Sequence, residues 1–153
     1  MTIRRATISD VATLVDLNRS TQAMHAAAEP DMFRADPPDD VVAAAFRSSI
    51  ETSSSLWLIA EEGRACGYLS ADFREIPESW CHIRHQVCYI AAIAVDPAFR
   101  RKGIARALLS RLKAEAAARG VQRIELSVFA FNVEAKKAFE GLGFRTLIER
   151  KVL

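Results

Sequence analysis

The stretch from residue 95 to residue 112, VDPAFRRKGIARALLSRL, joins the two patterns that decide the fold. Residues 87–96, which lead into it, are continuously apolar, a pattern typical of a strand covered on both faces of a sheet. Pro97 ends that strand, because a proline cannot donate to a central ladder. After Gly103 the apolar residues recur at four-residue spacing, which predicts a helix that stops at Gly120. The chain therefore passes from a central strand through a short loop into a helix.

The loop between this strand and this helix carries three consecutive cations, Arg100, Arg101 and Lys102. The first N–H groups of a helix lack intrahelical partners, and the helix dipole adds roughly half a positive charge at that end. Acidic side chains are favoured there, so three cations have the wrong sign for an ordinary surface helix. A bound anion would offset the positive charge of these residues. Because Gly103 has no Cβ, such an anion could approach the backbone N–H groups closely. A solvated basic turn is the alternative.

The established phosphate-binding motifs do not explain this loop. The sequence contains neither GxxxxGK[ST] nor GxGxxG. Kinase, GTPase and Rossmann dehydrogenase interpretations are therefore excluded on sequence pattern.

The remaining segments predict a mixed sheet. Expected strands cover residues 2–5, 55–62, 64–73, 87–96, 123–128 and 144–153, and expected helices cover 10–28, 40–50, 103–120 and 132–143. A hairpin in the middle of the chain and two later strand-helix-strand crossovers favour helices on both faces of the sheet. The expected class is α/β (α+β), with about six to seven strands, about four helices and residues 87–96 near the centre.

Length and composition limit the classes of function. The 153 residues suit one domain, and 21 Lys+Arg against 19 Asp+Glu leave a net charge of +2, too small for a protein that coats nucleic acid. No apolar run approaches the ~18 residues of a membrane span, and the first ten residues lack a secretory signal. We therefore expect a cytoplasmic protein without nucleic-acid or membrane partners. Three cysteines without metal-ligand spacing predict reduced thiols and no metal.

Two motifs resemble those of the GNAT superfamily of N-acetyltransferases. Arg100-x-x-Gly103-x-Ala105 resembles the family's [RQ]xxGx[GA] pyrophosphate loop, and residues 132–144, NVEAKKAFEGLGF, resemble its second motif. The two motifs occur in the expected order on the expected elements. The resemblance covers about residues 85–145 and implies a GNAT fold over residues 1–153.

The resemblance implies acetyl-CoA as cofactor, lying in a V-shaped split between two parallel strands. The pantetheine amides would pair with the first strand and the pyrophosphate would lie on the loop. The implied cofactor-binding residues are Ile93, Ala94, Val95, Arg100, Arg101, Lys102, Gly103, Ile104, Ala105, Asn132 and Phe139. Asn132 also has the simpler role of a helix N-cap.

The implied reaction is direct transfer of the acetyl group to a primary amine of a small molecule or peptide. One position departs from the family: Phe139 stands where a tyrosine commonly protonates the leaving thiolate, and a phenyl ring has no proton to donate. Tyr89 or water is the alternative acid, and the candidate bases are His85, His82, His25 and Glu29. The substrate pocket is expected to include His25, Phe33, Phe73 and Trp80.

The sequence leaves open an alternative function and the oligomeric state. Because of Phe139 and the lack of a carboxylate on the central strand, a non-catalytic acyl-CoA-binding or sensor module is the alternative function. A homodimer is the expected assembly if the protein is not a monomer.

Overall fold

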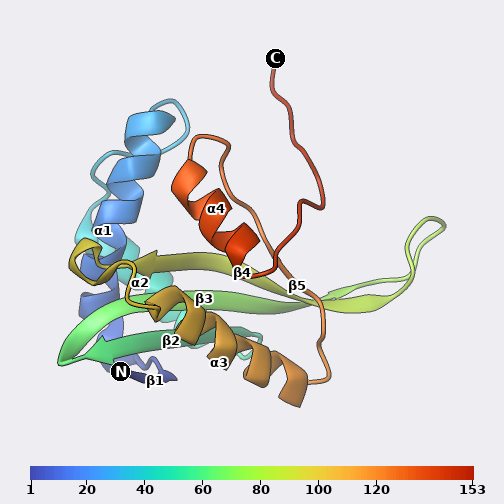
Figure 1. Cartoon of the computed structure of the whole chain (residues 1–153), viewed down its shortest axis with the longest axis horizontal. Helices are drawn as coiled ribbons and strands as arrows, with labels where there is room; N and C mark the ends of the chain where they lie inside the picture. The colour runs from blue at the N-terminus through green and yellow to red at the C-terminus, as the bar shows by residue number, and fades with distance from the viewer.

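The computed structural model describes all residues, 1–153. Its four α-helices are α1 (Val11–Ala28), α2 (Asp39–Ile50), α3 (Ile104–Ala118) and α4 (Val133–Gly141), and two short 3-10 turns are η1 (Ile8–Asp10) and η2 (Pro97–Phe99). Its five strands are β1 (Thr2–Arg5), β2 (Ser55–Glu62), β3 (Arg64–Ile76), β4 (His85–Val95) and β5 (Ile124–Leu126). Figure 1 shows these elements arranged around one central sheet.

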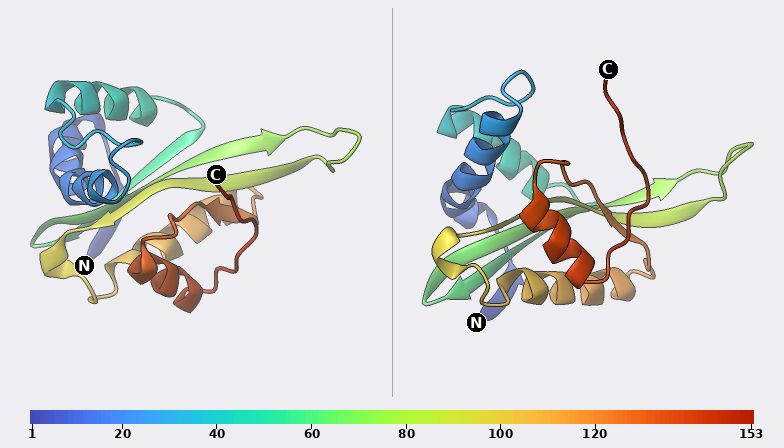
Figure 2. Two further views of the ribbon diagram at one scale, coloured as in Figure 1. Left: turned by 90° about the horizontal axis from the view of Figure 1, so that it is seen from above. Right: turned by 45° about the horizontal axis from the view of Figure 1, so that its top comes forward.

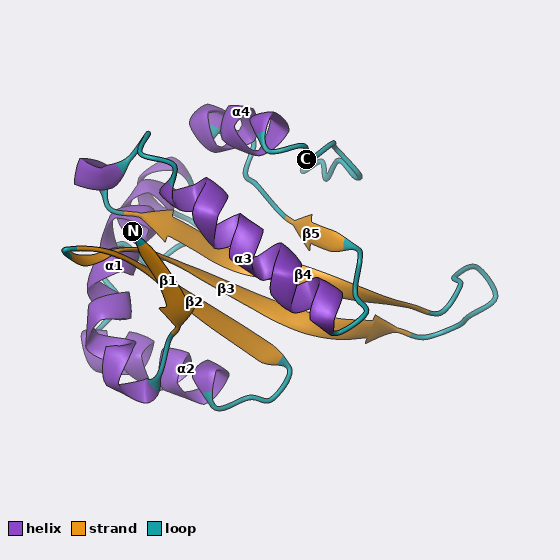
Figure 3. Cartoon of the chain, turned by 60° about the horizontal axis from the view of Figure 1, so that its bottom comes forward, coloured by secondary structure: helices purple, strands orange, loops and turns teal.

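The strands lie in the sheet in the order in which they occur in the chain, β1-β2-β3-β4-β5. The first three neighbouring pairs are antiparallel, and β4 with β5 is parallel. A parallel neighbour needs a crossover connection, and α3 supplies it across one face of the sheet (Figure 3). The expected mixed sheet is confirmed.

Helices cover both faces of the sheet, as expected. Seen from above in Figure 2, α1 and α2 lie on one side and α3 and α4 on the other. The alternation of β2 divides its side chains between two cores: Leu56 and Leu58 pack beneath α3, whereas Trp57 and Ile59 pack beneath α1. The sheet is thus buried on both sides, which accounts for the continuous apolar runs in the sequence.

The number of strands differs from the expectation of six to seven. Residues 144–153, expected as a final strand, form no regular structure. The segment has strand-like composition, but a strand exists only where its backbone pairs with a neighbour, and none lies beside it in this chain. The strand expected near the centre, β4, and the helix α3 have the expected bounds within one or two residues. In the five-stranded sheet β3 is the middle strand, and β4 lies between it and the edge strand β5.

The β3–β4 hairpin extends beyond the rest of the molecule as an arm (Figures 1 and 2). Pairing continues to Ile76 and His85 at the base of its loop. None of the helices combines the length and the apolar character that crossing a membrane requires.

Candidate active site

The parallel strands β4 and β5 separate after a short paired region. Cys88–Ile90 pair with Ile124–Leu126, whereas β4 continues to Val95. Residues 92–95 therefore have a strand partner on the β3 side only. The register between β3 and β4 shifts at Ala91, where one extra residue forms a bulge next to the last pair with β5. The outcome is an open strand edge with free backbone donors and acceptors, the split that the resemblance implies.

The loop that follows this edge presents backbone N–H groups. Arg101 has φ 61° and Gly103 has φ 81°, both in the left-handed region, and the two turns direct the chain into α3. The N–H groups of Arg101, Lys102 and Gly103 donate to no protein acceptor. The first backbone bond of the helix runs from Ala107 N–H to the Gly103 carbonyl, at 3.0 Å. Consecutive free N–H groups at a helix start form an anion-binding site.

The three cations of the loop are exposed and form no ion pair with any carboxylate. The Lys102 ammonium lies 4.8 Å from the centre of the Phe99 ring, and the Arg64 guanidinium contacts the same ring at 4.8 Å. Arg64 is paired with Asp96 at 2.8 Å, so its charge is already matched. Arg100 and Arg101 have no carboxylate partner of this kind, so their charge is available to bind an external anion.

Gly67 contributes to this site although the sequence pattern did not single it out. It pairs with Val95, the last residue of β4. A Cβ at Gly67 would lie 2.9 Å from the Ala94 carbonyl oxygen and 3.0 Å from a methyl group of Ile104. Glycine is needed here because the start of α3 packs directly on β3.

The second motif forms α4 and the residues that flank it. The Asn132 side-chain oxygen accepts from Ala135 N–H at 3.1 Å and caps the helix, while its amide N–H groups have no protein partner. The Phe139 ring lies edge to face with Phe144, with centroids 5.7 Å apart. The geometry of Asn132 is compatible both with the helix N-cap and with a contact between its free amide N–H groups and a cofactor.

Three of the candidate acid–base residues lie at different places. Tyr89 is in the paired region next to the split, and its hydroxyl donates to Ser127 Oγ at 2.9 Å. His85 begins β4, five residues before Ile90 and roughly 16 Å from it at the rise of a strand. Glu29 follows α1 and is exposed. Of the three, Tyr89 is the one beside the split.

Aromatic residues from distant parts of the chain meet beside the continuation of β5. His25 of α1 contacts Phe33, Phe129 and Phe131, with ring centroids 5.0, 5.3 and 5.6 Å apart. We call these four residues the aromatic cluster. His25 Nδ1 lies 2.8 Å from the Thr21 carbonyl oxygen, so Nδ1 carries a proton and donates, and a neutral ring has Nε2 as its free base. The structure brings together two expected pocket residues and adds two that were missed.

Phe73 and Trp80 do not join the aromatic cluster. Phe73 packs on the α3 side of the sheet, beneath the Arg119 guanidinium at 4.5 Å. Trp80 lies in the loop of the β3–β4 arm and is 97% exposed. The residues expected to wall one pocket are therefore divided among three regions.

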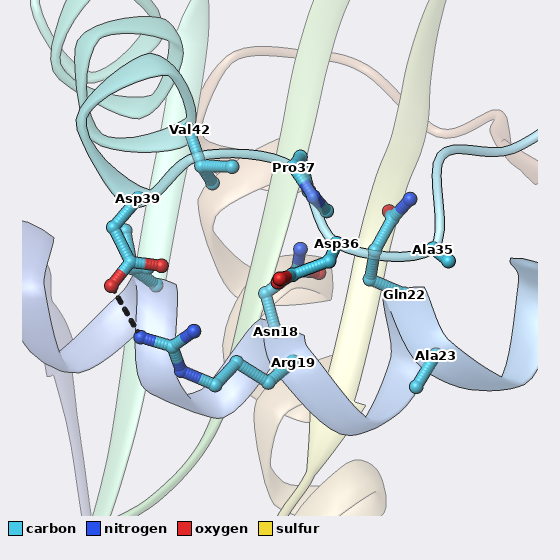
Figure 4. Close-up of a pocket in the computed structure, with 10 residues that line it drawn as sticks. Asn18, Arg19, Gln22, Ala23, Ala35, Asp36, Pro37, Asp39 and Val42 are labelled. Atoms are coloured by element: carbon cyan, nitrogen blue, oxygen red, sulfur yellow. Dashed lines mark hydrogen bonds and ion pairs between the residues drawn. The ribbon is translucent and has the colours of Figure 1, made fainter.

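A cavity of about 170 Å³ lies between α1 and the segment that leads to α2 (Figure 4). Among the lining residues, Arg19 pairs with Asp39 at 2.6 Å, and Gln22 donates to the Arg34 carbonyl at 2.7 Å. Asn18, also in the lining, accepts from the Tyr68 hydroxyl at 2.7 Å. The cavity lies on the α1 side of the sheet, and it contains none of the residues of the split or the basic loop.

The environment of the thiol on β4 disfavours a covalent route through Cys88. Cys88 is fully buried, and burial raises its pKa to about 11. The thiolate is the nucleophilic form, so this thiol is inert at neutral pH.

Comparisons with known proteins agree with this geometry. The family model described as Acetyltransferase (GNAT) family matches residues 20–144. The [Ribosomal protein bS18]-alanine N-acetyltransferase of Escherichia coli K12 is 44% identical over 59 residues, which are 39% of this chain and 40% of that protein. The chain thus matches less than half the length of this relative.

Solved structures share the whole fold. A tetramutant of the BH1408 protein from Bacillus halodurans superposes with a TM-score of 0.95 at 24% identity, covering 100% of this chain and 99% of that one. A protein of Clostridium acetobutylicum described as a predicted acetyltransferase and solved with acetyl-CoA superposes with a TM-score of 0.71 at 23% identity, covering 99% of this chain and 94% of that one. Because the family model matches residues 20–144, which are most of the chain, the chain belongs to the GNAT acetyltransferase family.

Proposed function

We propose that the protein transfers the acetyl group of acetyl-CoA to a primary amine of a small molecule or peptide. One observation carries the proposal: the open edge of β4 leads directly into a loop with free N–H groups and unpaired cations. A pyrophosphate linked to an amide-containing arm fits both features. The N–H groups of residues 101–105 would hold the pyrophosphate, with Arg100 or Lys102 adding a charge-assisted contact.

The open edge of β4 would hold the pantetheine arm. Asp96 N–H donates to the Cys66 carbonyl on the β3 side, and backbone groups alternate along a strand, so Ile93 and Val95 face the β5 side while Ala94 between them faces β3. The arm's amides are suited to extend the sheet at Ile93 and Val95. The free amide N–H groups of Asn132 would contact the arm from the other side of the split, next to Phe139 on α4. When bound there, the cofactor would supply an activated acetyl thioester for transfer to the amine.

Residues near the split would donate and accept the protons that the reaction transfers. Tyr89 is the proposed acid for the leaving thiolate, because its hydroxyl is held beside the split by Ser127. The amine must lose a proton as it attacks, and the free Nε2 of His25 in the aromatic cluster can accept one through water, which makes it a better-placed base than His85. A backbone N–H near the Ala91 bulge would stabilise the oxyanion.

The cofactor assignment is tested with two matched glycine variants. Gly103 and Gly63 both have positive φ and open space where a Cβ would project, so valine strains each to a similar degree. We expect Gly103→Val to raise the Kd for acetyl-CoA at least about tenfold, because the Cβ blocks close approach of the pyrophosphate. Gly63→Val, in the β2–β3 turn, should leave it unchanged. Calorimetric titration that gave equal affinities for both variants would remove the pyrophosphate-loop assignment.

A non-catalytic acyl-CoA-binding module is the second candidate, favoured by the phenyl ring of Phe139, which packs on Phe144 and offers no proton. A thiol-release assay over a library of amines separates the two functions. Release of coenzyme A above background with at least one amine supports the enzyme. Tight binding of acetyl-CoA without release from any amine supports the binding module.

A further inference from the structure

The hydroxyl of Tyr89 has one hydrogen-bond partner, Ser127 Oγ, to which it donates at 2.9 Å. The proton of this phenol therefore points at the serine. A serine hydroxyl that accepts one hydrogen bond still has its own proton to donate. No group of the chain accepts that proton, so Ser127 is the end of the pair that can donate to a bound molecule.

Ser127 lies at the point where the parallel strands separate. Leu126 ends β5 and forms the last pair with Ile90, so Ser127 is the first residue beyond the pairing on one side and Ala91 the first on the other. Leu126 packs toward the core beneath α3, and side chains alternate along a strand, so Ser127 projects to the opposite face of the sheet. Ser127 is exposed there, whereas Tyr89 lies within the paired region.

Neighbouring charged residues leave the Tyr89 proton directed at the serine. The Arg74 guanidinium lies 4.5 Å from the centre of the Tyr89 ring and covers one of its faces. Two carboxylates flank Tyr89 in the register of the sheet, Asp72 on β3 and Glu125 on β5, and they are paired with Arg74 and Arg123. Neither carboxylate accepts from the phenol, so its proton is left to the serine.

We propose that Ser127 is a catalytic residue of the acetyl transfer, whose hydroxyl donates a proton to the leaving sulfur and regains one from Tyr89. This inference rests on the proposed function and specifies how the Tyr89 proton reaches the sulfur. As the amine nitrogen bonds to the acetyl carbon, the carbon–sulfur bond breaks and its electron pair stays on sulfur. Ser127 Oγ gives its proton to that sulfur and takes the phenol proton, and the phenolate regains a proton from solvent.

The amine loses its own proton through water to His25, as proposed above, so the protons of the reaction balance. The relay also explains how the protein can act without a tyrosine on α4. The hydroxyl that Phe139 lacks is supplied from β4 and β5 instead.

The kinetic test compares Ser127→Ala, Tyr89→Phe and the double variant with wild type, using release of coenzyme A with the best amine of the library. We expect each single variant to lower kcat at least about tenfold and to leave the Kd for acetyl-CoA unchanged. The double variant should lose no more than either single one, because the two hydroxyls act as a unit. Ser127→Thr keeps a hydroxyl and should keep kcat within about threefold of wild type.

Ser49→Ala is the matched control. Ser49 Oγ accepts from the Trp57 indole N–H at 2.9 Å, the distance found for the Tyr89–Ser127 bond, but it lies on α2. Ser49→Ala therefore removes an equivalent hydrogen bond away from the split, and it should leave kcat unchanged. Thermal unfolding checks that the variants are folded; because Ser127 is exposed, its truncation should cost little stability.

A measurement without turnover tests the contact itself. The chain has two tyrosines, so protein labelled with 3-fluorotyrosine gives two fluorine NMR signals. We expect coenzyme A to shift the Tyr89 signal and to leave that of Tyr68, which is fully buried, in place. Desulfo-coenzyme A, which lacks the thiol, should bind without this shift. Ser127→Ala should bind coenzyme A and lose the shift, because the sulfur acts on Tyr89 through the serine.

The outcomes separate the relay from the proposed function. A wild type that releases coenzyme A with no amine would overturn the proposed function, and the relay with it. An active wild type whose kcat is unchanged in Ser127→Ala would overturn the relay alone. So would losses that multiply in the double variant, or equal shifts of the Tyr89 signal with coenzyme A and its desulfo analogue.

Discussion

Glu115 is the residue with the densest charge pairing in the molecule. Its carboxylate lies 2.6 Å from Arg5, 2.9 Å from Arg111 and 3.0 Å from Arg119, and its side chain is 10% exposed. Because Arg5 is on β1, these contacts join the edge strand to α3. We expect Glu115→Gln to lower the free energy of unfolding by about 2 kcal/mol, the typical contribution of charge-assisted hydrogen bonds to one buried acid. Urea denaturation at neutral pH measures it.

The same acid predicts a pH dependence of stability. The hydrogen bond from Arg5, followed by those from Arg119 and Arg111, lowers the pKa of Glu115 to about 2 from an ordinary value of 4.5. The folded state therefore binds this proton less readily than the unfolded state, so the stabilisation is complete above pH 4.5 and is lost as the pH falls toward 2. The difference between wild type and Glu115→Gln should shrink over that interval. The control Glu140→Gln, on an exposed helix face without an ion pair, should change stability by less than about 0.5 kcal/mol. An equal difference at pH 7 and pH 2.5 would contradict the charge-based explanation.

At the scale of elements, the sequence predicts the helices, strands and turns that are determined by residues close together in the chain. The α3 helix and its basic loop follow from apolar spacing, Pro97 and Gly103, and the structure confirms the helix and the turn. The segment 144–153 has the composition of a strand, but whether it pairs depends on an edge elsewhere in space. The bulge at Ala91 has no local signal either, because it is defined by the register with β3.

In the candidate site, too, contacts between residues close in the sequence could be predicted, whereas contacts between distant residues could not. His25 and Phe33 were expected to lie together since they flank the end of α1, whereas Phe129 and Phe131 lie about 100 residues later in the sequence, in the loop after β5. A tertiary contact of this kind leaves no periodic pattern. The nearest signal is the spacing of two phenylalanines immediately before Asn132, which a search for loop aromatics ahead of a capped helix would find.

If the aromatic cluster lines the acceptor pocket, a change in it should alter the KM for the acceptor amine. Phe129 contacts both His25 and Phe33, with centroids 5.3 Å away in each case, so its ring fixes the wall of the proposed pocket. Phe129→Leu should raise KM for the best amine of the library at least about tenfold and leave the Kd for acetyl-CoA unchanged. Phe46→Leu is the control, because Phe46 packs on Trp57 and Tyr68 in the other aromatic group. Equal effects of the two variants on KM would assign Phe129 a structural role alone.

At the scale of the whole molecule, the body and the β3–β4 arm differ in how their side chains are buried. The two tryptophans report on them separately: Trp57 is 6% exposed beneath α1 and α2, whereas Trp80 is 97% exposed on the arm. Trp57 also donates to Ser49 Oγ at 2.9 Å and stacks on Tyr68. The sheet and its two cores should therefore unfold as one cooperative unit to which Trp80 contributes no packing energy.

Single-tryptophan variants test this division. We expect Trp80→Phe to change the free energy of unfolding by less than about 0.5 kcal/mol, because no packed contact is removed. Its remaining fluorophore, Trp57, should shift its emission to longer wavelength when the chain unfolds. Trp57→Phe should cost about 1–3 kcal/mol through lost ring volume and an unpaired Ser49. Its remaining Trp80 should emit as a hydrated indole in both states. A strong shift in Trp80 emission on unfolding would show that the arm packs against another surface, and it would contradict this division.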